Sequence, residues 1–181
     1  MKQTIYAIIG ESITIKKVMQ YQLDDIDSMV KIITKALGRG NKLLLFGNGG
    51  SAADAQHIAG EFIGRYAAIA LTTNTSTITA IGNDYGFDHI FERQIESLCR
   101  KGDIAIGIST SGMSKNVILG LIAAKSKGAK CIALTGNRAG KMSNVADLTV
   151  KVPTTSTPRI QECHIMIGHI VYELVGQVMK R

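Results

Sequence analysis

A histidine and a glutamate four positions apart are the first residues in the chain that could carry chemistry. His57 and Glu61 lie in a segment, SAADAQHIAGEF, that is rich in residues favouring helices. Side chains at positions i and i+4 share one face of a helix, so this imidazole and carboxylate would point the same way. Such a pair suits acid–base catalysis or metal binding, and it equally suits an ordinary helix surface. The pair alone leaves these alternatives open.

A second group of polar residues lies in an otherwise apolar segment near the C-terminus. Gln161 and His169 are eight positions apart there, which places them about 80° apart around a helix and roughly on one side. Polar side chains within an apolar helix must find partners or serve a site. Two further histidines, His89 and His164, have no such context, and we interpret both as structural.

Two polar turns contain the groups that bind phosphate. The first, GNGGS, contains Gly49, Gly50 and Ser51 and follows the apolar run 43–46. Glycines let a ligand approach the backbone, and Ser51 suits the N-cap of a helix whose free N–H groups would attract an anion. The second turn, STSGMS, offers four hydroxyl groups beside another helix start: Ser109, Thr110, Ser111 and Ser114. Hydroxyl and N–H donors together favour a phosphate monoester, although the second turn alone fits a helix cap equally well.

Two nucleotide-binding motifs can be compared with the glycine turn. Gly47-x-Gly49-x-x-Ala52 superficially resembles the dinucleotide fingerprint, which needs an acidic residue at the end of the second strand to bind the ribose. Residues 71–74, where that strand would end, are Leu-Thr-Thr-Asn and contain no acid. The Gly-Lys-Ser/Thr of the P-loop does not occur either. The sequence therefore disfavours a nicotinamide cofactor and a P-loop nucleotide site.

The elements that must position these residues alternate between strand and helix. Apolar runs predict strands, and apolar residues at helical spacing predict the helices between them. The alternation predicts an α/β fold with a parallel sheet, in which ligands bind at the carboxyl ends of the strands. Two helices before the first strand are more than the sheet needs, and we expect their apolar faces to pack on another subunit. After the second strand we expect a polar loop at 72–77 and a short helix or turn at 78–84. We predict strands at 43–46, 67–71, 104–108, 131–134 and 148–152, and helices at 1–20, 24–38, 52–63, 87–98, before Gly128 and from the N-cap Thr157 to about 179.

Composition restricts the class of protein further. The 181 residues, 19.4 kDa, are most simply one domain spanning 1–181. The net charge is +7, but the basic residues are scattered and only 5% of residues are aromatic, so an anionic small substrate is favoured over nucleic acid. Cys99, Cys131 and Cys163 form no CxxC motif and are expected to be free thiols in the cytoplasm. No signal peptide or membrane span is predicted.

With these motifs assembled, the chain resembles the sugar isomerase (SIS) domain family and, within it, the bacterial phosphoheptose isomerases. The serine turn alone would indicate only a phosphosugar-binding SIS fold, whereas the HxxxE and RIQExH…H segments are more specific. The resemblance implies a three-layer α/β/α fold with a five-stranded parallel sheet and extra N-terminal helices, assembled as a homotetramer with sites at subunit interfaces. It is carried by FGNGGSAADAQHIAGE, AIGNDYGFDHIF, GISTSGMSKN and TPRIQECHIMIGH.

The implied activity is that of an aldose–ketose isomerase, an intramolecular oxidoreductase. It would convert sedoheptulose 7-phosphate to D-glycero-D-manno-heptose 7-phosphate through an enediol, the first step of heptose synthesis for lipopolysaccharide or capsule. Glu61 and His169 would move the protons, since a carboxylate can take a carbon-bound proton and an imidazole can shuttle one between oxygens. By the same resemblance, Gly49 and Gly50 would belong to the substrate site, and the sugar would contact Asn48, Asp84 and Gln161. The phosphate would be held by Ser51, Ser109, Thr110, Ser111 and Ser114.

Some members of the family also bind zinc. By the resemblance, each subunit would bind one zinc ion through His57, Glu61, Gln161 and His169. Imidazoles and a carboxylate are usual zinc ligands, while the amide is less usual. The ion would polarise the carbonyl. A ligating Glu61 is a poorer free base, so the two roles of this residue stay open.

Pro158 departs from the family pattern, because some relatives have an acidic residue at this position.

Three alternatives accompany this interpretation. The chain could be a non-catalytic SIS scaffold or regulatory protein, but scaffold members lack the equivalents of Glu61 and His169, which are both present here. It could also be an isomerase of another phosphosugar or a sensing module, and the absence of an appended DNA-binding or transferase segment disfavours the latter.

Overall fold

Strands β1 and β3 are buried along their whole length, as expected for central strands of a parallel sheet covered on both faces. In this computed structural model, which describes residues 1–180, five strands form one sheet in the order β2-β1-β3-β4-β5, and each neighbouring pair is parallel. The predicted parallel sheet is therefore confirmed. The strands are β1 (Leu43–Gly47), β2 (Ala68–Ala70), β3 (Ile104–Ser109), β4 (Lys130–Thr135) and β5 (Leu148–Lys151).

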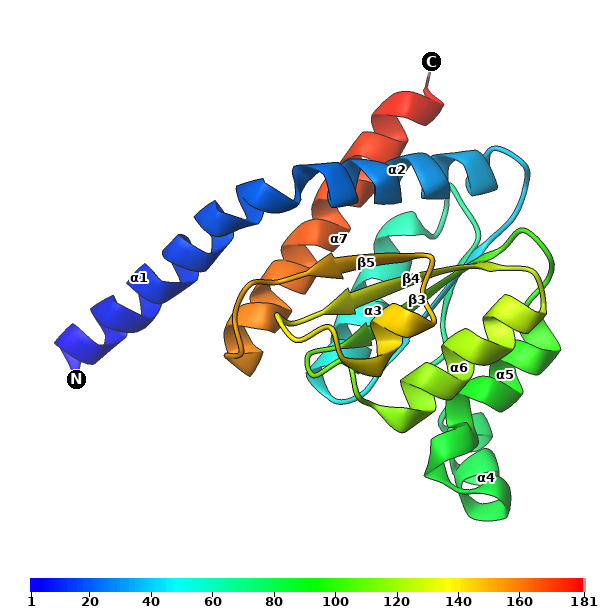
Figure 1. The fold of residues 1–181 in the computed structure, drawn as a ribbon. Helices are drawn as coiled ribbons and strands as arrows, with labels where there is room; N and C mark the ends of the chain where they lie inside the picture. Colours follow the sequence, from blue (N-terminus) through cyan, green and yellow to red (C-terminus); the bar gives the residue numbers. More distant parts are fainter. Residues whose placement is uncertain (181) are drawn as a thin grey trace.

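Helices cover both faces of the sheet (Figure 1). Successive strand residues point to opposite faces, so Leu43 and Leu45 belong to one buried core while Leu44 and Phe46 belong to the other. The first core is completed by α2, α3 and α7, and the second by α5 and α6 with α4 at its margin. The helices are α2 (Leu23–Leu37), α3 (Gly50–Phe62), α4 (Thr75–Tyr85), α5 (Ile90–Leu98), α6 (Lys115–Ser126) and α7 (Thr157–Met179).

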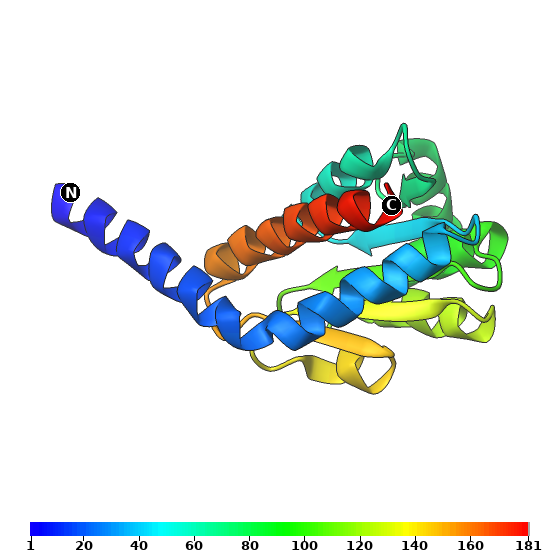
Figure 2. The same ribbon diagram turned by 90° about the horizontal axis from the view of Figure 1, so that it is seen from above.

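Helix α1 (Lys2–Val18) extends away from this three-layer body (Figures 1 and 2). None of its residues, all of which are described, is buried, and Ile5, Ile8 and Ile9 are each about half exposed. Its contacts with the rest of the chain include a hydrogen bond of 2.6 Å from Ser12 Oγ to Glu162 Oε2. This helix thus presents an apolar surface that nothing in residues 1–180 covers. No helix in that part of the chain is long and apolar enough to cross a membrane.

Some predicted boundaries are wrong in an informative way. The N-cap of α3 is Gly49, with φ of 55°, so Ser51 lies inside the first turn and is buried rather than capping it. The N-cap of α7 is Ser156, one residue before the predicted Thr157. Helix α4 begins within the predicted polar loop because the Asn74 side chain accepts a 3.0 Å hydrogen bond from Thr77 N–H. A 3₁₀ turn, Phe87–His89, precedes α5 in place of one continuous helix.

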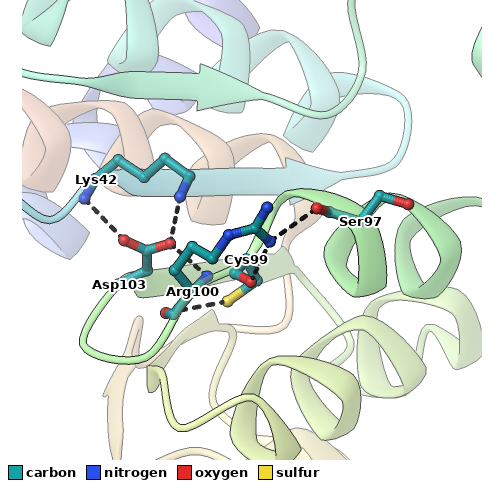
Figure 3. A network of polar contacts seen from close by, with 5 residues as sticks. All are labelled: Lys42, Ser97, Cys99, Arg100 and Asp103. Atoms are coloured by element: carbon teal, nitrogen blue, oxygen red, sulfur yellow. Dashed lines mark hydrogen bonds and ion pairs between the residues drawn. The ribbon is translucent and has the colours of Figure 1, made fainter.

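At the N-terminal ends of the central strands, a buried carboxylate joins the segments that lead into β1 and β3 (Figure 3). Asp103, 2% exposed, accepts hydrogen bonds from Lys42 N–H at 3.0 Å, Lys42 Nζ at 2.5 Å and Arg100 N–H at 2.8 Å. These bonds span the segments that lead into β1 and β3. Nearby, burial raises the pKa of the Cys99 thiol. The three cysteines are free and buried within residues 1–180, as predicted.

Removing the Asp103 carboxylate should lower the free energy of unfolding. Asp103→Ala leaves the Lys42 ammonium partly buried and two amide groups without their acceptor, and we expect the free energy of unfolding to fall by about 3 kcal/mol. Urea unfolding measures the change. Asp27→Ala, which removes an exposed ion pair with Lys31, is the control and should have no measurable effect. Equal effects of the two substitutions would contradict a special role for Asp103.

Candidate active site

The two polar turns at the ends of β1 and β3 line one cavity of about 330 Å³. The neighbouring strands β1 and β3 end side by side, with Gly47 paired to Ile108. The turns that follow them are therefore brought together at the point where the strand order reverses, which is the usual ligand position in such sheets. The cavity is lined by Asn48, Gly49, Gly50, Ser51, Ile108, Ser109, Thr110, Ser111, Ser114, Thr157 and Gln161.

The hydroxyl groups of the serine turn face one another in this cavity. Ser109 Oγ lies 2.9 Å from Ser114 Oγ and 3.4 Å from Ser111 Oγ. Ser114 is the N-cap residue of α6, yet its hydroxyl caps no backbone N–H in the described chain. The Ser114 hydroxyl is therefore directed at Ser109 rather than at the backbone of α6. The N-termini of α3 and α6 both begin at the cavity, and their partial positive charges favour an anion.

The loop that follows β4, which begins at Thr135-Gly136-Asn137, packs against the serine turn. Gly136 N–H donates a 3.0 Å hydrogen bond to the Thr110 carbonyl, and Met142 N–H donates one of 3.1 Å to the Gly112 carbonyl. Gly112 has a φ of 65°, and a Cβ there would lie 2.0 Å from the Ala139 carbonyl oxygen. Only glycine fits this close approach. The serine turn is thus held in one shape by the loop that follows β4.

His57, Glu61 and His169 gather on the α3–α7 surface. The Nε2 atoms of the two histidines are 2.8 Å apart, and His57 Nε2 lies 3.5 Å from Glu61 Oε1. One ligand atom from each residue falls within 4.8 Å of the others. The side chains of His57 and Glu61 are 50% and 36% exposed, so a substrate or an ion can reach them. Two imidazoles and a carboxylate form a group able to hold a metal ion such as zinc.

Gln161 lies at the cavity and on the same helix, α7, as His169. Its side chain packs on Gly50, where an added Cβ would lie 2.2 Å from Nε2. Gly50 precedes His57 on α3, and Gln161 precedes His169 on α7, so the cavity and the cluster lie along one helix pair. The separation along α3 is about 10 Å at 1.5 Å per residue. An extended phosphosugar with its phosphate in the cavity could therefore reach the cluster.

The remaining predicted contact residue, Asp84, is not brought to this site. It lies on the exposed helix α4, where its carboxylate accepts a 2.9 Å hydrogen bond from Asn83 Nδ2. It does not line the cavity that contains the serine turn. Within one chain, the structure therefore separates Asp84 from the other predicted sugar contacts.

Two residues at the site escaped the sequence analysis. Asn116 is 3% exposed and exchanges two hydrogen bonds with Asn48, of 2.8 and 2.9 Å. Asp54 precedes His57 by one helical turn, and its Oδ2 is buried without a hydrogen-bond partner in residues 1–180. Burial raises the pKa of this carboxyl to about 6, and the nearby His57 opposes that rise. The sequence signal was weak in both cases, since polar residues in the first turns of helices are common.

The two histidines interpreted as structural have partners outside the cluster. His164 is fully buried, and its Nε2–H donates a 3.2 Å hydrogen bond to the Thr135 carbonyl. Burial lowers the pKa of this imidazole to about 4, and the bond to Thr135 only partly offsets that effect. His89 pairs through Nδ1 with Glu92 on α5. Both arrangements fit the structural interpretation.

Comparison with known proteins places the fold and the site in one family. The SIS domain family matches residues 12–136. The phosphoheptose isomerase of Aquifex aeolicus is 52% identical over 99% of this chain and 98% of its own length. The solved phosphoheptose isomerase of Neisseria gonorrhoeae superposes with a TM-score of 0.95 at 42% identity, covering 97% of this chain and 98% of that one. The corresponding structure from Francisella tularensis gives 0.94 at 35% identity.

The parallel sheet, with its hydroxyl-lined cavity at the ends of β1 and β3, is that of a SIS domain. Within this class, the chain belongs to the phosphoheptose isomerase family.

The buried imidazole of His164 should make stability depend on pH. The folded-state pKa of His164, about 4, lies below the ordinary 6.5. Its contribution to the free energy of unfolding is therefore complete above pH 6.5 and is lost as pH falls toward 4. The physical reason is that the unfolded chain takes up a proton which the folded chain excludes. Urea unfolding between pH 4 and 7 should show a shallower pH dependence for His164→Gln than for the wild type. Identical slopes would show that His164 is not buried as a neutral group.

Proposed function

We propose that the protein is an aldose–ketose isomerase that converts sedoheptulose 7-phosphate to D-glycero-D-manno-heptose 7-phosphate. Membership of the phosphoheptose isomerase family supports this substrate. The observation that carries the proposal is the placement of an anion-binding cavity and a His–Glu–His cluster along one pair of helices. One part can hold the phosphate while the other meets the opposite end of the sugar. The product would serve heptose synthesis for lipopolysaccharide or capsule.

The phosphate would bind among the serine-turn hydroxyls and the N-termini of α3 and α6. Serine and threonine hydroxyls donate to phosphate oxygens, and the helix dipoles favour its negative charge. Ser51 and Gly50, in the first turn of α3, would supply the other side of this site. Asn48 and Gln161, which line the same cavity, would contact the sugar hydroxyls between the phosphate and the cluster.

Glu61 and His169 would carry the proton transfers. Glu61 would take a proton from C1 of the ketose and return it to C2, passing through an enediol. His169 would move a proton from the C1 hydroxyl to the oxygen on C2. C1 is oxidised and C2 is reduced in the same molecule, so no external oxidant or reductant is needed. General acid–base groups placed in this way contribute about 10² to 10⁴-fold each.

We also propose that the cluster binds Zn²⁺. His57, Glu61 and His169 supply nitrogen and oxygen donors within 4.8 Å of one another, which fits the ligands that zinc prefers. Gln161 packs on Gly50 at the cavity, so its side chain would have to turn toward the cluster to serve as the fourth ligand. A bound zinc ion supplies Lewis-acid polarisation of a substrate carbonyl. Glu61 would then divide its role between holding the ion and moving the proton.

The site would be completed by other copies of the chain in a homotetramer. Helix α1 leaves apolar side chains exposed, including Ile5, Ile8 and Ile13, and such surfaces commonly mark protein interfaces. Asp84 lies on the exposed helix α4. If Asp84 contacts the sugar, it would do so in the site of another subunit, which supports active sites at subunit interfaces.

Zinc binding can be tested without turnover. Equilibrium dialysis against Zn²⁺ should give one bound ion per chain for the wild type and strongly reduced binding for His57→Ala and His169→Ala. The control is His89→Ala, because His89 pairs with Glu92 away from the cluster. Zinc binding unchanged in both cluster variants would exclude this site.

Glu61→Gln tests the proposed chemistry. The amide keeps the shape of the side chain but cannot accept a carbon-bound proton, so kcat with sedoheptulose 7-phosphate should fall about 10² to 10⁴-fold. Steady-state kinetics of the folded variant measures the change. Glu96→Gln alters an exposed glutamate on α5 that pairs with Arg93 and should retain wild-type turnover. Near-normal kcat for Glu61→Gln would remove this residue from the mechanism.

A further inference from the structure

A reciprocal pair of amides joins the two turns of the cavity. Asn48 Nδ2 donates to Asn116 Oδ1 at 2.8 Å, and Asn116 Nδ2 donates to Asn48 Oδ1 at 2.9 Å. Asn48 belongs to the glycine turn after β1, while Asn116 lies in the first turn of α6, just after the serine turn. This pair therefore connects parts of the chain that are 68 positions apart.

Asn116 is itself held in place from the helix side. Its Oδ1 also accepts a 2.9 Å hydrogen bond from Val117 N–H, one of the N–H groups that have no carbonyl partner at a helix start. Asn116 thereby performs a capping function that the N-cap residue Ser114 does not, since the Ser114 hydroxyl lies 2.9 Å from Ser109 Oγ instead. With only 3% of Asn116 exposed, its amide has little freedom to rotate.

We propose that Asn116 is a positioning residue that orients the Asn48 amide toward the substrate. An amide has two N–H donors and an oxygen with two lone pairs. The pair with Asn116 uses one N–H and one lone pair of Asn48. One donor and one acceptor then remain on an amide whose plane is held in a single orientation, as a pair of adjacent sugar hydroxyls requires. This inference rests on the proposed sugar-binding role of Asn48.

The alternative is that Asn116 only stabilises the loops. The two roles differ in what they disturb. Loss of an orienting partner should lower kcat/KM through Asn48 and leave phosphate binding unchanged, because the bonds that hold the serine-turn hydroxyls and the loop after β4 do not include the side chain of Asn48 or Asn116. Loss of loop structure would disturb phosphate binding as well. The two roles can therefore be separated by measuring both properties.

The experiment is a double-mutant cycle of Asn116→Ala and Asn48→Ala. We expect Asn116→Ala to lower kcat/KM for sedoheptulose 7-phosphate about tenfold, as for loss of a hydrogen-bonded contact. In the Asn48→Ala background the same change should have little further effect, because coupled residues are not additive. The inhibition constant of inorganic phosphate should stay within about twofold of the wild-type value. Additive losses, or a parallel loss of phosphate inhibition, would overturn the positioning role.

Two further variants keep the outcomes distinct. Asn116→Asp retains an acceptor for Val117 N–H but cannot donate to Asn48, so it serves in the same cycle if the alanine variant does not fold. Gln94→Ala removes another buried amide, bonded to the Leu71 and Ile90 carbonyls, and should lower stability without changing KM. Wild-type protein that does not turn over sedoheptulose 7-phosphate would reject the proposed function. Active wild type with an unaffected Asn48→Ala would reject this inference alone.

Discussion

The pairing of β1 with β3 is the interaction on which the site depends. Its register, from Leu43 opposite Ile104 to Gly47 opposite Ile108, makes both strands end at one place. Gly47 permits the close packing there, because a Cβ would lie 2.7 Å from the Ile108 carbonyl oxygen. At the other end, Asp103 joins the segments that enter these strands. The cavity proposed to bind the phosphate is thus a consequence of backbone pairing rather than of any single side chain.

The site also depends on the close contact of α3 with α7. Gly168 packs on Ile58, where an added Cβ would lie 2.5 Å from Cγ1. This approach brings His57 and His169, from helices more than a hundred positions apart in sequence, to a nitrogen–nitrogen distance of 2.8 Å. Gln161 on the same helix meets Gly50 at the cavity. One helix pair therefore carries both the cavity proposed to bind phosphate and the cluster proposed to move protons.

Much of the fold could be predicted because its sequence signals are local. Apolar runs such as 43–46 predicted buried strands, and the glycine and serine turns stood directly at their ends. The features that could not be predicted depend on which hydrogen bonds individual side chains form. Asn74 extends α4 into a predicted loop by capping it, and Asn116 caps α6 in place of Ser114. Strand β2 is shorter than predicted and lies at the sheet edge.

The candidate site was predictable only in part for a similar reason. The spacing of His57 and Glu61 indicated a shared helix face, but their meeting with His169 depends on packing between distant helices. The resemblance assigned Asp84 to the sugar, and its exposed position on α4 could not be inferred from spacing. The buried oxygen of Asp54, which has no hydrogen-bond partner among residues 1–180, has no sequence signature. Residues in motifs could be found, whereas residues that act through tertiary contacts could not.

Proton NMR of sedoheptulose 7-phosphate incubated with the protein in D₂O tests the proposed isomerisation most directly. We expect an aldose heptose 7-phosphate that carries solvent deuterium at C2, because the side-chain base that takes the C1 proton exchanges it with solvent before returning it to C2. A folded protein that binds inorganic phosphate yet produces no heptose 7-phosphate would contradict the proposed reaction. An aldose product with no deuterium at C2 would contradict proton transfer through an exchanging base.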